Sequence, residues 1–173
     1  DHVTSAAGGE CHAYGGAEMN PLVEQQVRAR PLLGTMVEIA ASGAEGSVAS
    51  AISQAFAAIA EVQALMSYQD PASDLSHINQ YAFDEPVAVH AHTWQVLNTA
   101  RELSEASDGL FDITIAPTLT RMGFLPRHAH FPRASRHGDW RHVILLPCQR
   151  VQFLRRVRID LSGIAKGYAV DLA

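Results

Sequence analysis

A chain of 173 residues, 47% of them hydrophobic, has enough apolar side chains for one ordinary globular domain or for part of a larger one. Its formal net charge of -5 disfavours a general nucleic-acid-binding protein, which needs a basic surface. The sequence contains no run of about 20 apolar residues and no signal-peptide pattern, so we expect no transmembrane segment in it.

The first part of the chain is predicted to pass from a tail into a strand and then into a long helix. Residues 1–26 carry Gly, Ala, Ser and polar side chains without a period, which predicts a flexible N-terminal tail. Alternation of apolar and polar residues over 32–40 indicates a strand. Over 46–66 apolar residues recur at helical spacing, which predicts a core helix with these inward positions: Val48, Ile52, Phe56, Ile59, Val62, Leu65 and Met66.

Shorter elements follow in the middle of the chain. Ser73 or Asp74 can cap a short helix that runs toward Asn79. A second amphipathic helix is predicted over 93–107, with Asp108-Gly109 as its C-terminal stop. Strands are predicted at 86–90, 110–119, 143–146, 151–154 and 157–161, and 127–142 is predicted to be a polar loop. Helices and strands do not alternate regularly, so the expected fold class is α+β, with both long helices on one side of a mostly antiparallel sheet.

The last sixteen residues, RIDLSGIAKGYAVDLA, indicate a site for an anion or a metal ion. Ser162-Gly163 supplies a turn and a possible N-cap before a helix. Free backbone N–H groups and the positive dipole end at a helix start attract anions, and Lys166 adds a full positive charge. Asp160 and Asp171 place carboxylates before and after that lysine.

Two further features leave alternatives open. Asp112 stands between the apolar residues Phe111 and Ile113, and a half-buried carboxylate there needs hydrogen-bond donors from a loop or from a ligand. Four histidines fall within 127–142, where we favour an exposed loop over a metal site because nothing in the sequence fixes their geometry.

Four segments in a fixed order carry a resemblance to a known family. They are Leu33-Gly34-Thr35; the stretch 66–79, with Ser-Asp-Leu-Ser before Ile-Asn; 108–117, which reads DGLFDITIAP and is followed by Gly123-Phe124; and 160–171, which reads DLSGIAKGYAVD. Together they resemble the ApbE-type FAD:protein FMN transferases. By this resemblance 27–173 is the N-terminal portion of such a domain, which implies a T-fold-like but incomplete α+β fold.

The resemblance also implies which residues bind the ligand. Gly163 would offer its backbone carbonyl to Mg²⁺. No histidine of this chain falls at a matched catalytic position, so the catalytic residues stay unknown. Leu33 replaces the family's usual Met, a nearly volume-neutral change. The residues implied in FAD binding are Leu33, Asp74, Leu75, Ser76, Leu110, Phe111, Asp112, Asp160 and Lys166.

The implied activity is the Mg²⁺-dependent transfer of FMN from FAD to a threonine of an acceptor flavoprotein, with release of AMP. The family's catalytic His and its Asp/Thr metal ligands fall beyond 160–171, so we expect this chain alone to be inactive. The alternative is an FAD-binding or flavin-handling accessory protein without transferase activity, and a third reading has the chain fold only as an oligomer. The family resemblance implies a bacterial protein of the periplasm or inner membrane, with FAD and an acceptor flavoprotein as partners and no nucleic acid.

Overall fold

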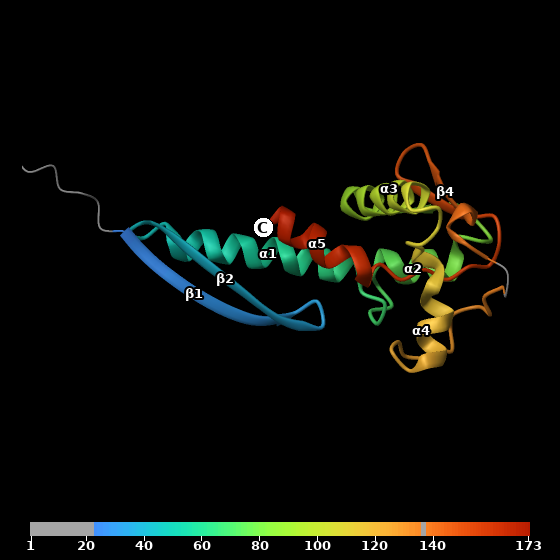
Figure 1. The fold of residues 1–173 in the computed structure, drawn as a ribbon, viewed down its shortest axis with the longest axis horizontal. Coiled ribbons are helices and arrows are strands. Elements are labelled where there is room, and N and C mark those ends of the chain that lie inside the picture. The colour runs from blue at the N-terminus through green and yellow to red at the C-terminus, as the bar shows by residue number, and fades with distance from the viewer. Residues whose placement is uncertain (1–22, 136–137) are drawn as a thin grey trace, which may run out of the picture.

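The computed structural model describes residues 23–135 and 138–173 and contains helices and two antiparallel sheets. A long hairpin and the C-terminal helix lie along one long helix, and the other helices and a small sheet form a broader end (Figure 1). The α+β class is therefore confirmed. The elements in chain order are β1 (Val23–Leu32), β2 (Thr35–Ala44), α1 (Val48–Met66), α2 (Asp74–Tyr81), β3 (Val87–Ala88), α3 (Ala91–Ala106), the 3-10 helix η1 (Ile113–Ile115), α4 (Ala116–Met122), the 3-10 helix η2 (Trp140–His142), β4 (Val143–Leu146), β5 (Arg150–Phe153) and α5 (Ser162–Leu172).

The hairpin differs from the prediction for this part of the chain. Strand β1 pairs with β2 along its whole length, so 23–26 belong to a strand rather than to the predicted tail, and 1–22 lie outside the described residues. The half-buried side of β1 carries the polar residues Glu24, Gln26 and Arg28, which bond to one another. Gln26 Nε2 donates to Glu24 Oε1 at 2.5 Å, and Arg28 donates to Gln26 Oε1 at 2.8 Å. An apolar alternation pattern therefore could not reveal this strand.

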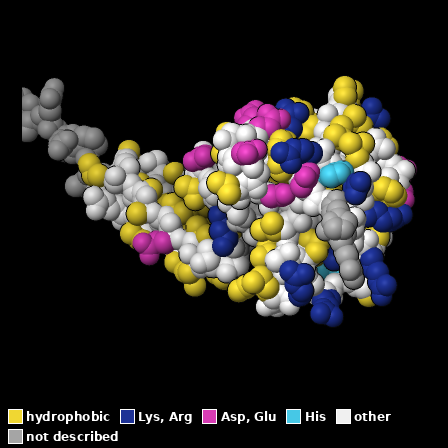
Figure 2. Space-filling view, turned by 45° about the vertical axis from the view of Figure 1, so that its right-hand side comes forward, with side chains coloured by type: hydrophobic (Ala, Val, Ile, Leu, Met, Phe, Trp, Pro, Cys, Tyr) yellow, Lys and Arg dark blue, Asp and Glu magenta, His cyan; other side chains and the backbone are white. Residues whose placement is uncertain are grey.

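The opposite face of the hairpin carries apolar side chains in solvent. Val23, Val27 and Met36 are each more than 60% exposed, and they occupy the same face of the paired strands. Figure 2 shows hydrophobic side chains along this narrow end of the molecule and Lys and Arg side chains mainly over the broad end.

Helix α1 is the central packing element. Its buried side chains include Ile52, Phe56, Ile59 and Val62, and it contacts the hairpin, α2, α3 and α5. By length and composition α1 is also the one candidate membrane span among the described residues. Its apolar stripe is shared between the core and the hairpin, as expected for a helix inside a folded domain.

The second sheet has the order β3-β5-β4, all antiparallel. Helix α3 contacts β4, so each sheet has its own helix, whereas the sequence predicted one sheet with both helices. The strands predicted near 86–90, 143–146 and 151–154 are confirmed. The predicted strand over 110–119 is wrong: the segment forms η1 and α4, because Asp112 caps η1 and Pro117 is favourable in the first turn of α4.

The segment 157–161 forms no strand, so the strand predicted there is also wrong. A side-chain amide replaces the strand ladder: Asn79 Nδ2 donates to the carbonyl of Ile159 at 2.9 Å, and the Ile159 N–H donates to Asn79 Oδ1 at 2.8 Å. The N–H of the next residue, Asp160, donates to the carbonyl of Ile113 at 2.9 Å. Both Asn79 and Ile159 are buried, so this pairing takes place away from water.

Replacing Asn79 by Ala should destabilise the protein by roughly 2 kcal/mol or more, because two buried backbone groups of Ile159 lose their partners and each costs about 1–3 kcal/mol. The measurement is the urea midpoint of the full-length protein. Asn98→Ala on the exposed side of α3 is the matched control and should change stability by less than about 0.5 kcal/mol. Equal midpoints for the two variants would show that the Asn79 pairing contributes nothing to stability.

Candidate functional site

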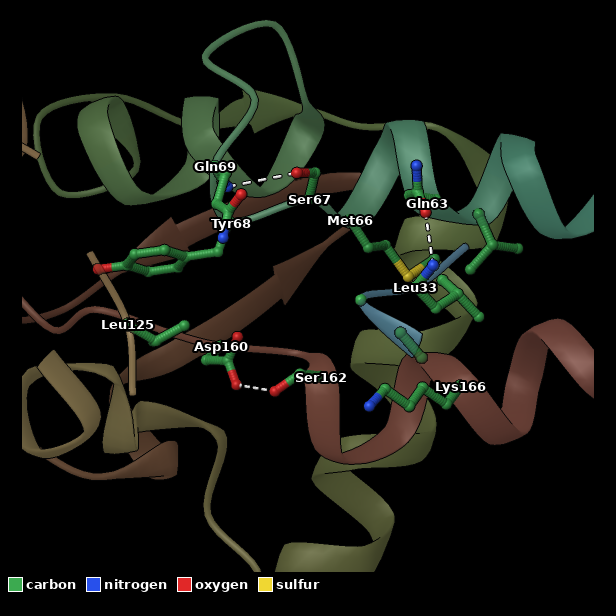
Figure 3. Close-up of a pocket in the computed structure, with 13 residues that line it drawn as sticks. Leu33, Gln63, Met66, Ser67, Tyr68, Gln69, Leu125, Asp160, Ser162 and Lys166 are labelled. Carbon is green, nitrogen blue, oxygen red and sulfur yellow. Dashed lines mark hydrogen bonds between the residues drawn. The ribbon is translucent and has the colours of Figure 1, made fainter. Parts of the chain in front are cut away.

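A cavity of about 310 Å³ lies where the hairpin turn, the end of α1 and the start of α5 meet (Figure 3). Its wall combines backbone turns, apolar side chains and two opposite charges. The residues that line it are Leu33, Gly34, Val62, Gln63, Met66, Ser67, Tyr68, Gln69, Leu125, Asp160, Ser162, Ala165 and Lys166.

The hairpin turn is fixed against α1 by one hydrogen bond. Leu33 and Gly34 are the two turn residues, and both have a positive φ, of 54° and 70°. Such turns match the twist of the flanking strands. The N–H of Leu33 donates to Gln63 Oε1 at 2.5 Å, so α1 holds the turn at the edge of the cavity. Of the residues implied in FAD binding, Leu33 thus lines the cavity.

Asp160 and Lys166 place opposite charges on one wall. Asp160 is only 6% exposed and accepts a hydrogen bond from the hydroxyl of Ser162. Lys166 is exposed, and in Figure 3 its side chain extends toward Ser162 and Asp160. The structure reports no ion pair between Asp160 and Lys166 among the described residues, which leaves the ammonium group available to an anion.

The start of α5 differs from the prediction in its cap. Ser162 is the first helical residue, Leu161 stands at the N-cap position, and no side chain caps this end. The Ser162 hydroxyl is used by Asp160 instead. Because Ser162 and Ala165 both line the cavity, the positive end of α5 faces it. This arrangement suits a phosphate or diphosphate group.

Tyr68 is a cavity residue that sequence reasoning missed. Its side chain is 5% exposed, its hydroxyl has no hydrogen-bond partner, and in Figure 3 its ring lies over Leu125. Behind it the ring packs against His128 and Phe131, with centroids 5.4 and 5.5 Å away. Its place directly after Met66-Ser67, within the second motif, was the signal available in the sequence.

The imidazole of His128, beside this ring, has a lowered pKa. Burial lowers the pKa of His128 below its usual value of 6.5, and the positive charges of His130 and Arg158 lower it further, against a hydrogen bond with the Tyr68 backbone that raises it. Because this pKa is lower in the folded state than in the unfolded state, protons bind the unfolded state more tightly. Its contribution to stability is therefore complete above pH 6.5 and declines as the pH falls below that value.

Three predicted ligand residues do not line the cavity. Asp74 Oδ2 accepts hydrogen bonds at 2.7 Å from the N–H of His90 and from Thr93 Oγ1, and so fixes the start of α3. Leu75 and Ser76 lie in the first turn of α2 and are 0% and 1% exposed. Ser73 caps this helix through the N–H of Ser76, as predicted. The structure therefore gives this motif a role in packing.

The third motif lies beside the start of α5, outside the cavity lining. Leu110 is 93% exposed, and a Cβ on Gly163 would lie 3.8 Å from the ring of Phe111. Asp112 has hydrogen-bond donors from the protein: Oδ1 accepts from the N–H and the hydroxyl of Thr114 at 2.7 Å, and Oδ2 accepts from the N–H of Trp140 at 3.4 Å. These donors lie in η1 and η2, so the carboxylate links the two 3-10 helices.

Comparisons with known proteins agree on one family. The ApbE family model matches residues 33–173. The FAD:protein FMN transferase of Vibrio cholerae serotype O1 is 31% identical over 120 residues, which cover 65% of this chain and 36% of the relative. The enzyme of the same name from Chlamydia pneumoniae is 27% identical over 119 residues, which cover 64% of this chain and 38% of the relative.

Solved structures show the same likeness. The ApbE protein of Thermotoga maritima superposes with a TM-score of 0.75 at 27% identity, over 86% of this chain and 50% of that chain. The flavin transferase ApbE of Vibrio cholerae superposes with a TM-score of 0.74 at 27% identity, over 86% of this chain and 52% of that chain. This chain thus spans about half the length of the solved relatives and corresponds to part of their fold. The ordered motifs, the family model and the superpositions together show that the chain belongs to the ApbE family.

Proposed function

We propose that the protein acts in flavin transfer, moving the FMN moiety of FAD to a threonine of an acceptor flavoprotein and releasing AMP. The observation that carries the proposal is the cavity itself, in which Lys166 and the uncapped start of α5 offer positive charge next to the buried carboxylate of Asp160. The names of the curated relatives support flavin transfer in general. The threonine acceptor and the AMP product remain proposals drawn from the family resemblance.

The chemistry of this reaction suits the groups present. Attack on a phosphorus within a diphosphate builds negative charge on the transferred phosphoryl oxygens, so positioning and charge neutralisation dominate the rate. Lys166 can neutralise that charge, and the backbone N–H groups at the start of α5 can bind the diphosphate oxygens. Leu33, Tyr68 and Leu125 also line the cavity and supply apolar contacts for the flat ring systems of FAD.

The donor set within the described residues fits Mg²⁺ only in part. Asp160 supplies one buried carboxylate, and Gly163 in the first turn of α5 supplies the proposed carbonyl. Mg²⁺ prefers six oxygen ligands, with one or two carboxylates beside substrate phosphates. A bound Mg²⁺ would neutralise diphosphate charge, and we propose that its remaining ligands come from FAD, water and residues outside this chain.

Replacing Lys166 by Ala in the full-length protein should lower the rate of flavin transfer by about 10²–10³-fold, because a preorganised charge at the reacting phosphoryl group is lost. The assay incubates the protein with FAD, Mg²⁺ and an acceptor that carries a target threonine, and reads covalent flavin on the acceptor by fluorescence. Arg101→Ala, on an exposed part of α3, is the control and should leave the rate unchanged.

The same assay separates transfer from simple flavin handling. An accessory protein without transferase activity would bind FAD in solution but leave the acceptor unmodified even in the unsubstituted protein. Transfer at the full rate by the Lys166→Ala variant would show that this lysine does not neutralise the transferred phosphoryl group.

Replacing Asp112 by Ala should lower stability by about 1 kcal/mol, because the side chain caps η1, and it should leave FAD affinity within about twofold of the unsubstituted value. Thr114→Val removes one donor to the same carboxylate and should also lower stability, by a smaller amount. The two measurements are urea unfolding and a flavin fluorescence titration. A tenfold loss of FAD affinity without loss of stability would return Asp112 to the ligand-binding residues implied by the motif.

A further inference from the structure

Three side chains that can ligate a metal converge away from the cavity. Glu61 lies on α1, His90 is the N-cap residue of α3, and His92 lies in the first turn of α3. One ligand atom from each lies within 4.8 Å of the other two. Glu61 Oε1 is 3.9 Å from His90 Nε2, and the two imidazole rings have centroids 5.0 Å apart. None of the three residues lines the proposed flavin site.

The backbone that carries His90 and His92 is fixed by hydrogen bonds to Asp74. Asp74 Oδ2 binds the N–H of His90 and the hydroxyl of Thr93, and Thr93 is fully buried. Glu61 precedes Val62, which is also fully buried. All three ligand side chains therefore start from fixed backbone positions, and only their exposed ends need to rotate to close around an ion.

Tyr168 gives His92 an orienting partner. His92 Nδ1 lies 2.7 Å from the Tyr168 hydroxyl, and the two rings meet edge to face at 5.7 Å. When Nδ1 donates its proton to the phenol oxygen, Nε2 carries the lone pair and is free to bind a metal. A histidine ligand normally has such an outer partner, which fixes its tautomer and ring orientation.

His90 offers the second nitrogen ligand at small cost. Its Nδ1 accepts only a long bond of 3.3 Å from the N–H of His92. Binding a metal through Nε2 moves the ring proton to Nδ1 and gives up that bond. The Glu61 carboxylate then supplies the charge that a divalent ion needs at this exposed position.

We propose that Glu61, His90 and His92 form a zinc-binding site that links α1 to α3 and, through Tyr168, to α5. Two imidazoles and a carboxylate are a ligand set that suits Zn²⁺, with water in a fourth position. Zinc–ligand bonds of about 2.0–2.2 Å require the ligand atoms to approach to roughly 3.4 Å, which rotation of the side chains provides. The nitrogen ligands disfavour Mg²⁺, which prefers oxygen.

The test uses the full-length protein after treatment with a chelator, with excess Mg²⁺ present to occupy oxygen-rich sites. Calorimetric titration with Zn²⁺ should show one tight equivalent. Glu61→Gln and His92→Gln should each weaken it by at least about tenfold, and Tyr168→Phe, which keeps the ring, by about tenfold. His77→Gln, at an exposed histidine of α2, is the matched control and should bind zinc like the unsubstituted protein.

Two further readouts locate the ion. Co²⁺ in place of Zn²⁺ should give the strong visible absorption of a four-coordinate site in the unsubstituted protein and in His77→Gln, but not in His92→Gln. Zn²⁺ should also raise the melting temperature of the unsubstituted protein and of His77→Gln, but not that of His92→Gln, because an ion bound to the folded state stabilises it by linking α1 and α3. Tight zinc binding by a protein that carries both Glu61→Gln and His92→Gln would place the ion elsewhere and overturn the proposal.

Discussion

The pairing of the Asn79 side chain with the backbone of Ile159 is the interaction on which the candidate site depends. It joins residues 80 positions apart and replaces the hydrogen bonds that a strand neighbour would have supplied to 157–161. Asp160 and the start of α5 follow directly after it, so this amide helps to set their positions, together with the hydrogen bond from the Asp160 N–H to Ile113 and the packing of α5 on α1. The second and fourth family motifs are thus parts of one structural unit, although the sequence presents them as separate signals.

A second constraint of the same type holds the other wall of the cavity. The Gln63 side chain binds the backbone of Leu33, as Asn79 binds that of Ile159. In both cases a side-chain amide on a helix binds backbone groups that no neighbouring strand satisfies. The cavity is therefore built at places where regular pairing ends, and side chains satisfy the backbone groups that remain. Such places can present backbone N–H groups to a ligand, which the inside of a sheet cannot.

The sequence predicted those parts of the structure in which one local rule dominates. Helical spacing was sufficient for α1 and α3, and the Ser73 cap was sufficient for α2. Strand β1 could not be predicted because its half-buried side carries Glu24, Gln26 and Arg28, which satisfy one another. For the site, Leu33, Asp160 and Lys166 line the cavity, whereas 74–76 packs in the core and at the start of α3. A motif marks residues that a family shares, and it does not separate those that hold the fold from those that touch a ligand.

The left-handed conformation of Leu33 limits what that position can be. With φ at 54°, a side chain branched at Cβ would crowd its own backbone, whereas one that branches later, or not at all, avoids the clash. Leu and the family's usual Met are both unbranched at Cβ, and Ile, Val and Thr are not. The backbone conformation of the hairpin turn therefore restricts which residue types fit at position 33, independently of any ligand. What looks like a preference for a hydrophobic contact in the cavity is in part a requirement of the backbone geometry that brings the residue there.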